Sequence, residues 1–188
     1  MLDRREFVRQ LLIDRGDLLV VSGLGSATYD VAAAGDHPLN FYLWGAMGGA
    51  AVIGLGLALA RFDRRVAVVT GDGDMLMGLG SLATIGVKQP NNLAIIVLNN
   101  ARYGETGMQA SHTKAGIDLV AMARACRFPA ARAVSRLEEA DEIRALLHAG
   151  EGPVFVSARV KPEEAPRVLP LRDGHAIKQR FVAALQSA

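Results

Sequence analysis

Residues 66–100 read VAVVTGDGDMLMGLGSLATIGVKQPNNLAIIVLNN, and this stretch decides how the chain folds. It begins with the apolar run VAVVT (66–70) and ends with a second apolar run, LAIIVL (93–98), while residues 79–87 between them have helical periodicity. Apolar runs of this length are typical of strands that are buried on both faces, and a helix that connects two such strands makes them parallel. The stretch therefore predicts a strand–helix–strand unit of a parallel sheet.

The same alternation continues on both sides of this stretch. Short apolar or β-branched runs predict further strands, and amphipathic or Gly/Ala-rich runs predict helices. The predicted strands cover 18–22, 41–43, 131–134 and 153–160, and the predicted helices cover 6–14, 27–34, 48–61, 117–126, 137–147 and 175–185. We expect an α/β fold with a parallel sheet covered by helices on both faces. A single domain over residues 1–188 is expected, with its core at 17–160 and a C-terminal connection and helix at 161–188.

Length and composition agree with one folded domain. The 188 residues are 51% hydrophobic and 21% charged, which excludes a disordered chain. The net charge is +2 without a basic stripe, so we expect no nucleic-acid partner. The single cysteine, Cys126, excludes an internal disulfide framework and a cysteine-based zinc site. The N-terminal residues MLDRREFVRQ are too charged for a secretory signal, so a cytoplasmic location is expected.

Residues 43–60 (LWGAMGGAAVIGLGLALA) carry no charge, and their interpretation is open between two kinds of helix. Eighteen apolar residues reach the lower limit for a membrane span, and Gly45 and Gly49 have the spacing of packed membrane helices. The alternative is a helix buried in the α/β domain, where small residues allow close approach. The glycines favour the second alternative, since each costs about 1 kcal/mol in a helix relative to alanine. We therefore expect no membrane partner.

Polar residues follow the two strands of the deciding stretch. Residues 71–73 (GDG) combine two glycines, which allow a sharp turn, with the carboxylate of Asp72, which can bind a hard cation. Residues 99–100 (NN) add amide oxygens at the next strand end. Taken singly, the first motif could be only a tight turn and the second only a helix cap. A further pair at 91–92 precedes a strand instead of following one.

Together, the two motifs resemble the thiamine diphosphate-binding motif: GDG, then the twenty-five residues 74–98, then NN. Upstream, LWGAMG (43–48) is similar to the segment of thiamine-dependent decarboxylases that contacts the aminopyrimidine ring. Downstream, NNARYGETGMQASHT (99–113) is similar to the small subunits of sulfopyruvate decarboxylase and to phosphonopyruvate decarboxylase. The resemblance extends over about residues 17–160. Over this range the chain resembles the pyrophosphate-binding (beta) subunit of thiamine diphosphate-dependent 2-oxo acid decarboxylases.

The resemblance implies a set of cofactor-binding residues. Magnesium would be held by Asp72, by the side chain of Asn100 and by the backbone carbonyl of Arg102. The diphosphate would lie against an early glycine loop and the GDG segment, which together comprise Gly25, Ser26, Gly71, Gly73 and Asp74. An acidic side chain is a departure at position 74, and we expect this carboxylate to point away from the phosphates or to bind them only through its backbone N–H.

The remaining residues implied by the resemblance would contact the rings of the cofactor. The Gly45 carbonyl would accept a hydrogen bond from the 4-amino group, and Met47 would hold the two rings in a V shape, although a plain core methionine is the alternative. Tyr103 and Gly104 would close over the cofactor. The candidate catalytic residues are Glu105 and His112, and a solvent-facing loop histidine is an equal alternative for the second. Other candidate substrate contacts are Thr106, Gln109 and Thr113.

The resemblance also implies a two-chain enzyme. In the family, a glutamate on a pyrimidine-binding domain activates the cofactor, and we expect that domain on a separate alpha subunit, with two copies of each chain. The substrate would be a small 2-oxo acid such as sulfopyruvate or phosphonopyruvate, and Arg102, Lys114 or a partner arginine could bind its anionic tail. Oxidation or carboligation of a 2-oxo acid, and a non-catalytic cofactor-binding subunit, remain alternatives.

Overall fold

The apolar runs form one parallel sheet in the computed structural model, which describes residues 1–149 and 151–186. Within this part of the chain the strand order is β2-β1-β3-β4-β8-β7, and every neighbouring pair is parallel. The strands are β1 Leu19–Ser22, β2 Asn40–Tyr42, β3 Val66–Gly71, β4 Leu93–Asn99, β7 Ala130–Val134 and β8 Val154–Arg159. The fold class predicted from the sequence is confirmed.

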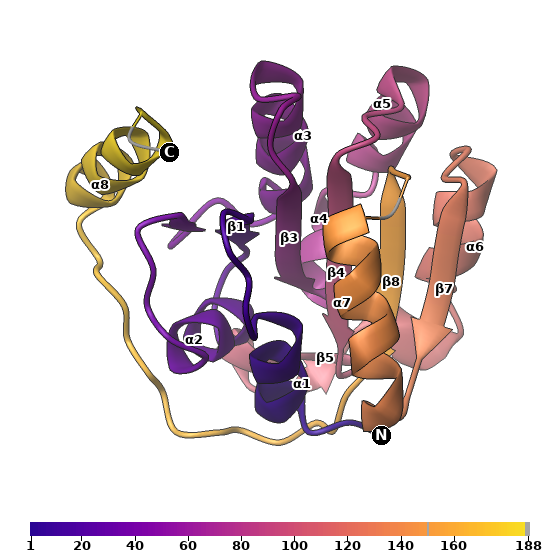
Figure 1. The fold of residues 1–188 in the computed structure, drawn as a ribbon. Coiled ribbons are helices and arrows are strands. Elements are labelled where there is room, and N and C mark those ends of the chain that lie inside the picture. The colour runs from indigo at the N-terminus through magenta and orange to yellow at the C-terminus, as the bar shows by residue number, and fades with distance from the viewer. Residues whose placement is uncertain (150, 187–188) are drawn as a thin grey trace.

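Helices cover both faces of the sheet (Figure 1). One face packs against α1 Arg4–Leu11, α2 Ser26–Ala33 and α7 Ala140–Ala149, and the other against α3 Ala50–Ala60, α5 Ser81–Lys88 and α6 Leu119–Ala125. In β3, Ala67 and Val69 belong to the first layer of the core, whereas Val66 and Val68 belong to the second. Because both faces are buried, the strands are apolar without alternation.

The uncharged residues 43–60 contain a short helix packed on the sheet. Only Ala50–Ala60 are helical, and Gly54 faces Val68 so closely that a Cβ at this glycine would overlap the valine side chain. Glycine therefore lets α3 approach β3. Across the described residues, every helix is too short or too polar to cross a membrane.

Two segments differ from the sequence predictions. Residues 71–73 were expected to form a sharp turn, but Gly71 ends β3 and helix α4 Asp72–Met77 starts at once. Two aspartates in the first turn favour the helix N-terminus, because they complement its partial positive charge. Residues 99–113, for which the sequence predicts no helix or strand, contain a small antiparallel hairpin of β5 Arg102–Tyr103 and β6 Gln109–Ala110, joined by the 3₁₀ turn Gly104–Thr106. Two further 3₁₀ turns cover His112–Ala115 and Leu137–Glu139.

The C-terminal strap (residues 161–173) runs from the end of β8 to the opposite edge of the sheet (Figure 1). It passes the N-terminal helix, where Arg5 donates to the Pro166 carbonyl at 2.7 Å, and reaches Trp44, whose indole N–H donates to the Leu171 carbonyl at 2.9 Å. Helix α8 Gly174–Gln186 then packs beside β2 through an edge-to-face contact of Phe41 with Phe181. The strap thus connects β8 with the β2 edge of the sheet.

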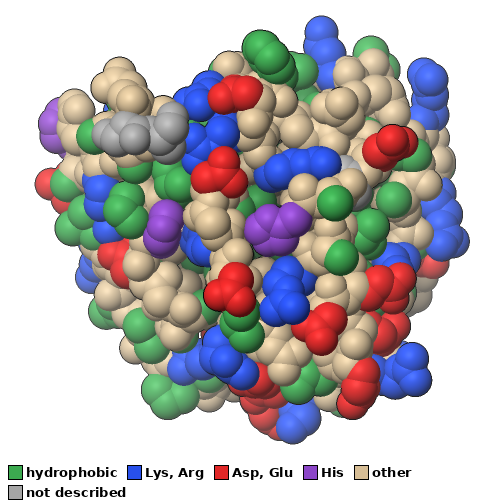
Figure 2. Space-filling view, in the orientation of Figure 1, with side chains coloured by type: hydrophobic (Ala, Val, Ile, Leu, Met, Phe, Trp, Pro, Cys, Tyr) green, Lys and Arg blue, Asp and Glu red, His purple; other side chains and the backbone are tan. Residues whose placement is uncertain are grey.

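Charges of both signs are interspersed on the face of the molecule drawn in Figure 2. Blue and red side chains alternate over this face, and neither sign forms a continuous stripe. This distribution agrees with the small net charge of +2.

Candidate active site

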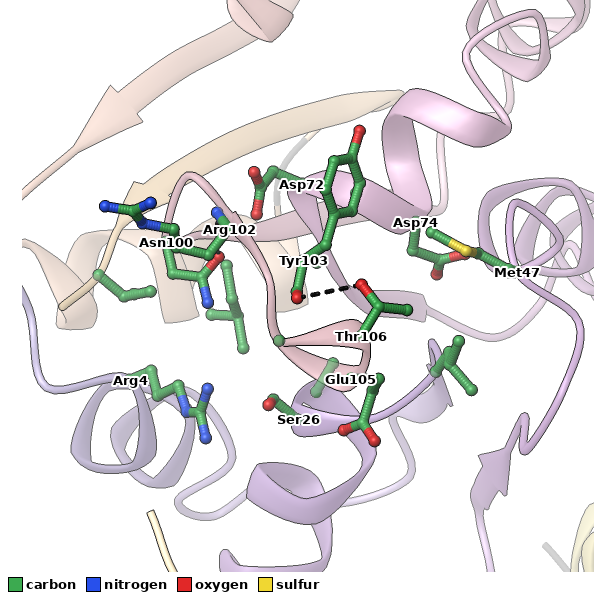
Figure 3. A pocket seen from close by; sticks show the side chains of 17 residues that line it. Arg4, Ser26, Met47, Asp72, Asp74, Asn100, Arg102, Tyr103, Glu105 and Thr106 are labelled. Carbon is green, nitrogen blue, oxygen red and sulfur yellow. Dashed lines mark hydrogen bonds between the residues drawn. The ribbon is translucent and has the colours of Figure 1, made fainter. Parts of the chain in front are cut away.

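Three chain segments meet beyond the carboxyl ends of β1, β3 and β4. Strand order reverses between β1 and β3, because the chain first leaves β1 toward β2 and then returns to the other side. Such a reversal opens the crevice in which parallel α/β sheets bind ligands. The segments touch at Gly23, where a Cβ would overlap both the Asp74 carboxylate and the Thr70 hydroxyl. Most of the predicted cofactor residues line the cavity at this point, with the exception of Gly25 and Gly45 (Figure 3).

Asp72 places a buried carboxylate in this cavity. Its residue is 1% exposed, and its carboxylate accepts hydrogen bonds from the Ser111 hydroxyl and, at 3.0 Å, from the Thr113 hydroxyl. Burial raises the pKa of the Asp72 carboxyl, and these hydroxyls together with the backbone N–H of Asn100 partly offset that rise. Within the described residues no cation pairs with this carboxylate. A buried charge of this kind is costly unless a cation binds it.

Asn100 lies at the next strand end and supplies neutral oxygen. Its Oδ1 accepts the backbone N–H of Arg102 at 2.9 Å, which fixes the amide and leaves the second lone pair of that oxygen available. The residues therefore fit Mg²⁺, which takes one or two carboxylates, other oxygens and phosphate oxygens of a ligand. Among the described residues, three or more His, Cys, Asp or Glu side chains do not gather anywhere as a metal site. That finding agrees with a site that uses one carboxylate, Asp72.

The N-terminus of α2 borders the same cavity. Gly25 precedes this helix with a φ of 69°, a left-handed conformation that glycine adopts without strain, and Ser26 lines the cavity. The Glu105 carboxylate lies directly over this turn, since a Cβ at Gly25 would be 2.7 Å from Glu105 Oε1. Arg167 of the C-terminal strap lies 3.8 Å from the same carboxylate. Glu105 therefore lies at the α2 end of the cavity.

Residues 45–48 form the opposite end of the cavity. Met47 is 37% exposed and lines the cavity, and Gly45 is exposed beside it. The Gly48 backbone N–H and the Thr70 hydroxyl both donate to the buried Asp74 carboxylate. The Asp74 carboxylate is thus directed to the 47–48 turn and holds it against the start of α4.

Tyr103 lies over Gly73 in the middle of the cavity. A Cβ at Gly73 would be 2.7 Å from the Tyr103 ring and 3.7 Å from the Met47 side chain, so this position requires glycine. The Tyr103 hydroxyl is 2.9 Å from Nδ1 of His112. Gly104 follows Tyr103 and also lines the cavity.

The two candidate catalytic residues are not brought together. Glu105 lines the main cavity, whereas His112 lines a neighbouring apolar groove that Met47 and Tyr103 share with the cavity. His112 contacts the main cavity only through the hydroxyl of Tyr103. Of the other candidate substrate contacts, Thr106 lines the cavity, while the Thr113 hydroxyl is occupied by Asp72. Gln109 is exposed and bonds to Thr106.

Sequence reasoning missed two residues of the site. Ser111 is 2% exposed and bonds to Asp72 from 39 positions along the chain. Arg4 lines the cavity from the N-terminal helix. The first lies in a polar segment without periodicity, and the second lies far from both motifs, so neither carries a local signal in the sequence.

Comparisons with known proteins agree with this geometry. Residues 23–158 match the family described as thiamine pyrophosphate enzyme, C-terminal TPP binding domain. This chain belongs to that family. Over its full length it is 37% identical to the sulfopyruvate decarboxylase subunit beta of Methanothermobacter thermautotrophicus, of which it covers 98%. The family predicted from the GDG and NN motifs is confirmed.

One further relative and one solved structure of similar fold are longer chains. The phosphonopyruvate decarboxylase of Streptomyces viridochromogenes is 41% identical over 146 residues, which are 78% of this chain and 36% of the relative. The crystal structure of benzoylformate decarboxylase from Polynucleobacter necessarius superposes with a TM-score of 0.69 at 18% identity, over 86% of this chain and 34% of that one. Similar sequence therefore occurs both as a chain of this length and as about a third of a longer decarboxylase, and the fold recurs in a second longer decarboxylase.

Proposed function

We propose that this chain is the beta subunit of a thiamine diphosphate- and Mg²⁺-dependent decarboxylase that acts on a 2-oxo acid, sulfopyruvate or phosphonopyruvate. The observation that carries the proposal is the buried, cation-free Asp72 carboxylate, placed where the motif shared with these decarboxylases puts the metal. Similarity over the full length to a sulfopyruvate decarboxylase beta subunit supports the choice of reaction.

The chain's own residues would bind and orient the cofactor. Asp72 and Asn100, together with the Arg102 carbonyl, would hold Mg²⁺, and the backbone of Gly71 and Gly73 would face the diphosphate. When bound, thiamine diphosphate supplies an electron sink for the electrons released as CO₂ leaves a 2-oxo acid.

Three further residues would orient the rings and exclude water. The exposed side chain of Met47 would support the rings from the side opposite to α2, and the Gly45 carbonyl would accept a hydrogen bond from the 4-amino group. Tyr103, which lies over Gly73, would shield the reacting atoms from water.

A partner alpha subunit would complete the site. Met47 and Met77 are both exposed and line one apolar groove at the ring end of the cavity, which a second chain could cover. This chain would need a carboxylate from the partner to activate the cofactor, because Glu105 lies at the α2 end, away from Met47. Two copies of each chain, with cofactors at their interfaces, are the simplest assembly.

The substrate would enter at the ring end of the cavity, beside Met47 and Tyr103. A sulfonate or phosphonate tail requires a cation, and Arg102, Lys114 or an arginine of the partner could supply it. Glu105 faces the cavity directly, whereas His112 would move a proton only through the Tyr103 hydroxyl.

Reconstitution with the candidate alpha chain tests the proposal. CO₂ release is measured from sulfopyruvate, phosphonopyruvate, pyruvate and 2-oxoglutarate, with each chain alone and with both chains mixed. We expect release only from the mixture, only with thiamine diphosphate and Mg²⁺, and fastest with one of the first two acids. Full activity of the isolated chain would contradict the two-chain site. Electron transfer to an acceptor instead of simple CO₂ release would assign the oxidative alternative, and an inactive mixture that binds the cofactor would assign a non-catalytic subunit.

A further inference from the structure

Arg4 is a buried arginine at the end of the cavity opposite Met47. Its residue is 8% exposed, and Figure 3 shows its side chain extending from α1 toward Ser26. It lines the cavity together with Asn100. This arginine precedes the matched family segment 23–158, so membership of the family does not account for it.

The start of the chain is fixed at the carboxyl edge of the sheet, and this places Arg4 at the site. Leu2 forms a parallel bridge with Val160, just beyond the end of β8. Its backbone N–H donates to the Arg159 carbonyl at 3.0 Å, and its carbonyl accepts the Lys161 N–H at 2.9 Å. Helix α1 begins two residues later, with the Asp3 side chain as its N-cap. The first helical residue is therefore held above the ligand crevice.

The guanidinium of Arg4 is paired with Asp30 through Nε, and its terminal nitrogens have no partner among the described residues. Its Nε lies 2.9 Å from Asp30, yet the contact lacks hydrogen-bond geometry, and this nitrogen is buried without a hydrogen-bond partner. Other arginines of the described chain also have an Nε without a hydrogen bond, but their terminal nitrogens donate: Arg15 to Asn40, Arg64 to the Asp17 carbonyl and Arg180 to Asp36. Arg4 makes no such bond within residues 1–149 and 151–186. Buried polar groups are normally hydrogen-bonded, so the terminal nitrogens of Arg4 are donors that a ligand in the cavity can use.

The buried carboxylate beside Arg4 has more than one cationic partner. Asp30 is fully buried and receives two cations, because Arg5 approaches it at 3.3 Å while Arg4 lies at 2.9 Å. One carboxylate therefore faces two guanidinium groups. Glu105 on the cavity rim has Arg167 at 3.8 Å as its own partner, and Glu163 and Glu164 line an adjoining pocket together with Arg4. Arg102 also lines the cavity, but it donates to the Met108 carbonyl.

We propose that Arg4 binds the terminal phosphate of the cofactor diphosphate, so that the N-terminal helix contributes a phosphate contact to the site. The inference rests on the proposed function. A diphosphate whose metal lies between Asp72 and Asn100 extends toward Ser26, and the Arg4 guanidinium lies at that end. An arginine fork matches phosphate oxygens with two parallel N–H donors. The buried position keeps the interaction strong, because water screens it little.

Calorimetry with two probes tests the proposal on the full chain. The probes are thiamine diphosphate and inorganic pyrophosphate, each with Mg²⁺, since the second has the phosphates but no rings. Arg4→Gln should weaken the binding of both probes by at least about tenfold, which corresponds to about 1.4 kcal/mol. The matched control is Arg5→Gln, which removes the other cation of Asp30 and should leave both affinities within about threefold. Equal affinities for Arg4→Gln and the wild-type chain would overturn the assignment.

A second pair of variants covers the case in which Arg4→Gln fails to fold. In Arg4→Gln with Asp30→Asn no buried carboxylate loses its partner, and Asp30→Asn alone is the reference. The double variant should again bind pyrophosphate at least about tenfold more weakly than its reference. Wild-type binding of pyrophosphate but not of thiamine diphosphate would contradict the proposed function and leave the Arg4 contact standing. Binding of neither probe by this chain, both alone and mixed with the candidate alpha chain, would refute both.

Discussion

Strand β4 has an asparagine pair at each end, and the two pairs have opposite surroundings. At the amino end, Asn92 is 7% exposed, and its amide nitrogen reaches three backbone carbonyls, those of Ala58, Arg61 and Arg64, at 2.8 to 3.0 Å. At the carboxyl end, Asn100 lines a cavity and uses its oxygen for one backbone N–H. The first amide is saturated by the protein, whereas the second has bonding capacity left.

The difference teaches how to separate structural from functional polar residues in a parallel sheet. Asn92 closes the end of α3 and the turn that follows it, so its hydrogen bonds stabilise the fold. Asn100 and the buried Asp72 lie where helices diverge from the strand ends, and there partners come from a ligand. If this distinction is correct, substitutions at the amino end should change stability, and substitutions at the carboxyl end should change cofactor binding.

The largest effect is expected for Asp72→Ala. Removal of the one carboxylate of the proposed metal site should lower the affinity for thiamine diphosphate with Mg²⁺ by more than about a hundredfold, since charged ligand contacts dominate such sites. The urea midpoint should change little, because Ser111 and Thr113 still bond to each other. Calorimetry and urea unfolding of the same preparation check both statements. Unchanged cofactor affinity would remove Asp72 from the metal site.

Asn92→Ala should destabilise the fold by about 2 to 3 kcal/mol, because buried backbone carbonyls lose their donor. Its cofactor affinity, measured well below the unfolding midpoint, should equal that of the wild-type chain. Denaturant unfolding and calorimetry provide the two readouts. A cofactor defect at full folding would show that the two ends of β4 are coupled.

Asn100→Ala should change cofactor affinity and leave stability nearly unchanged, the opposite of Asn92→Ala, and its effect should be smaller. Loss of a neutral oxygen ligand should weaken cofactor binding by about tenfold, corresponding to about 1.4 kcal/mol, with a stability change below 1 kcal/mol. The matched control is Asn91→Ala, because Asn91 is exposed and contributes its backbone carbonyl, not its side chain, to Arg65 and Gly152. Equal cofactor defects in Asn91→Ala and Asn100→Ala would contradict the assignment of the functional pair.

The smallest expected effect is the pH dependence of stability that arises from the buried Asp72 carboxyl. Burial raises the pKa of Asp72 in the folded chain, so the folded state binds this proton more tightly than the unfolded state. The cofactor-free fold should therefore gain stability as pH falls from the raised pKa toward the ordinary value near 4. Asp72→Asn should be more stable than the wild type at pH 7, and the gap should shrink as pH falls. Urea unfolding of Asp72→Asn and of the wild type, at pH 7 and at about pH 4, measures this difference in stability. A difference independent of pH would contradict the prediction.

The sequence predicts the sheet well because its strands carry a local signal. VAVVT and LAIIVL are β-branched runs buried on both faces, and the sheet contains both as neighbouring strands. Helix α4 could not be predicted, since the sequence GDGDML combines glycines and aspartates that disfavour helices in isolation. Tertiary packing overrides that preference, because a Cβ at Gly78, just after α4, would overlap the Gly48 backbone.

The residues of the site likewise divide into those that the sequence predicts and those that it does not. Asp72 and Asn100 follow strands, so their proximity could be predicted from the parallel order alone. Ser111 and Arg4 reach the cavity through long-range folding: one through the β5–β6 hairpin, whose strands are two residues each, and the other through the bridge of Leu2 with Val160. Strand pairs this short leave no periodic pattern to detect.

The packing of α8 beside β2 bears on aggregation. An open sheet offers unpaired backbone groups along its outermost strands, and these can recruit strands from other molecules. Here the outermost strand next to β1 is only three residues long, and α8 packs beside it through Phe41 and Phe181. A variant that weakens this aromatic contact would leave the active site intact but expose the unpaired backbone groups of β2. Such a variant should self-associate during storage or concentration while its cofactor affinity is unchanged.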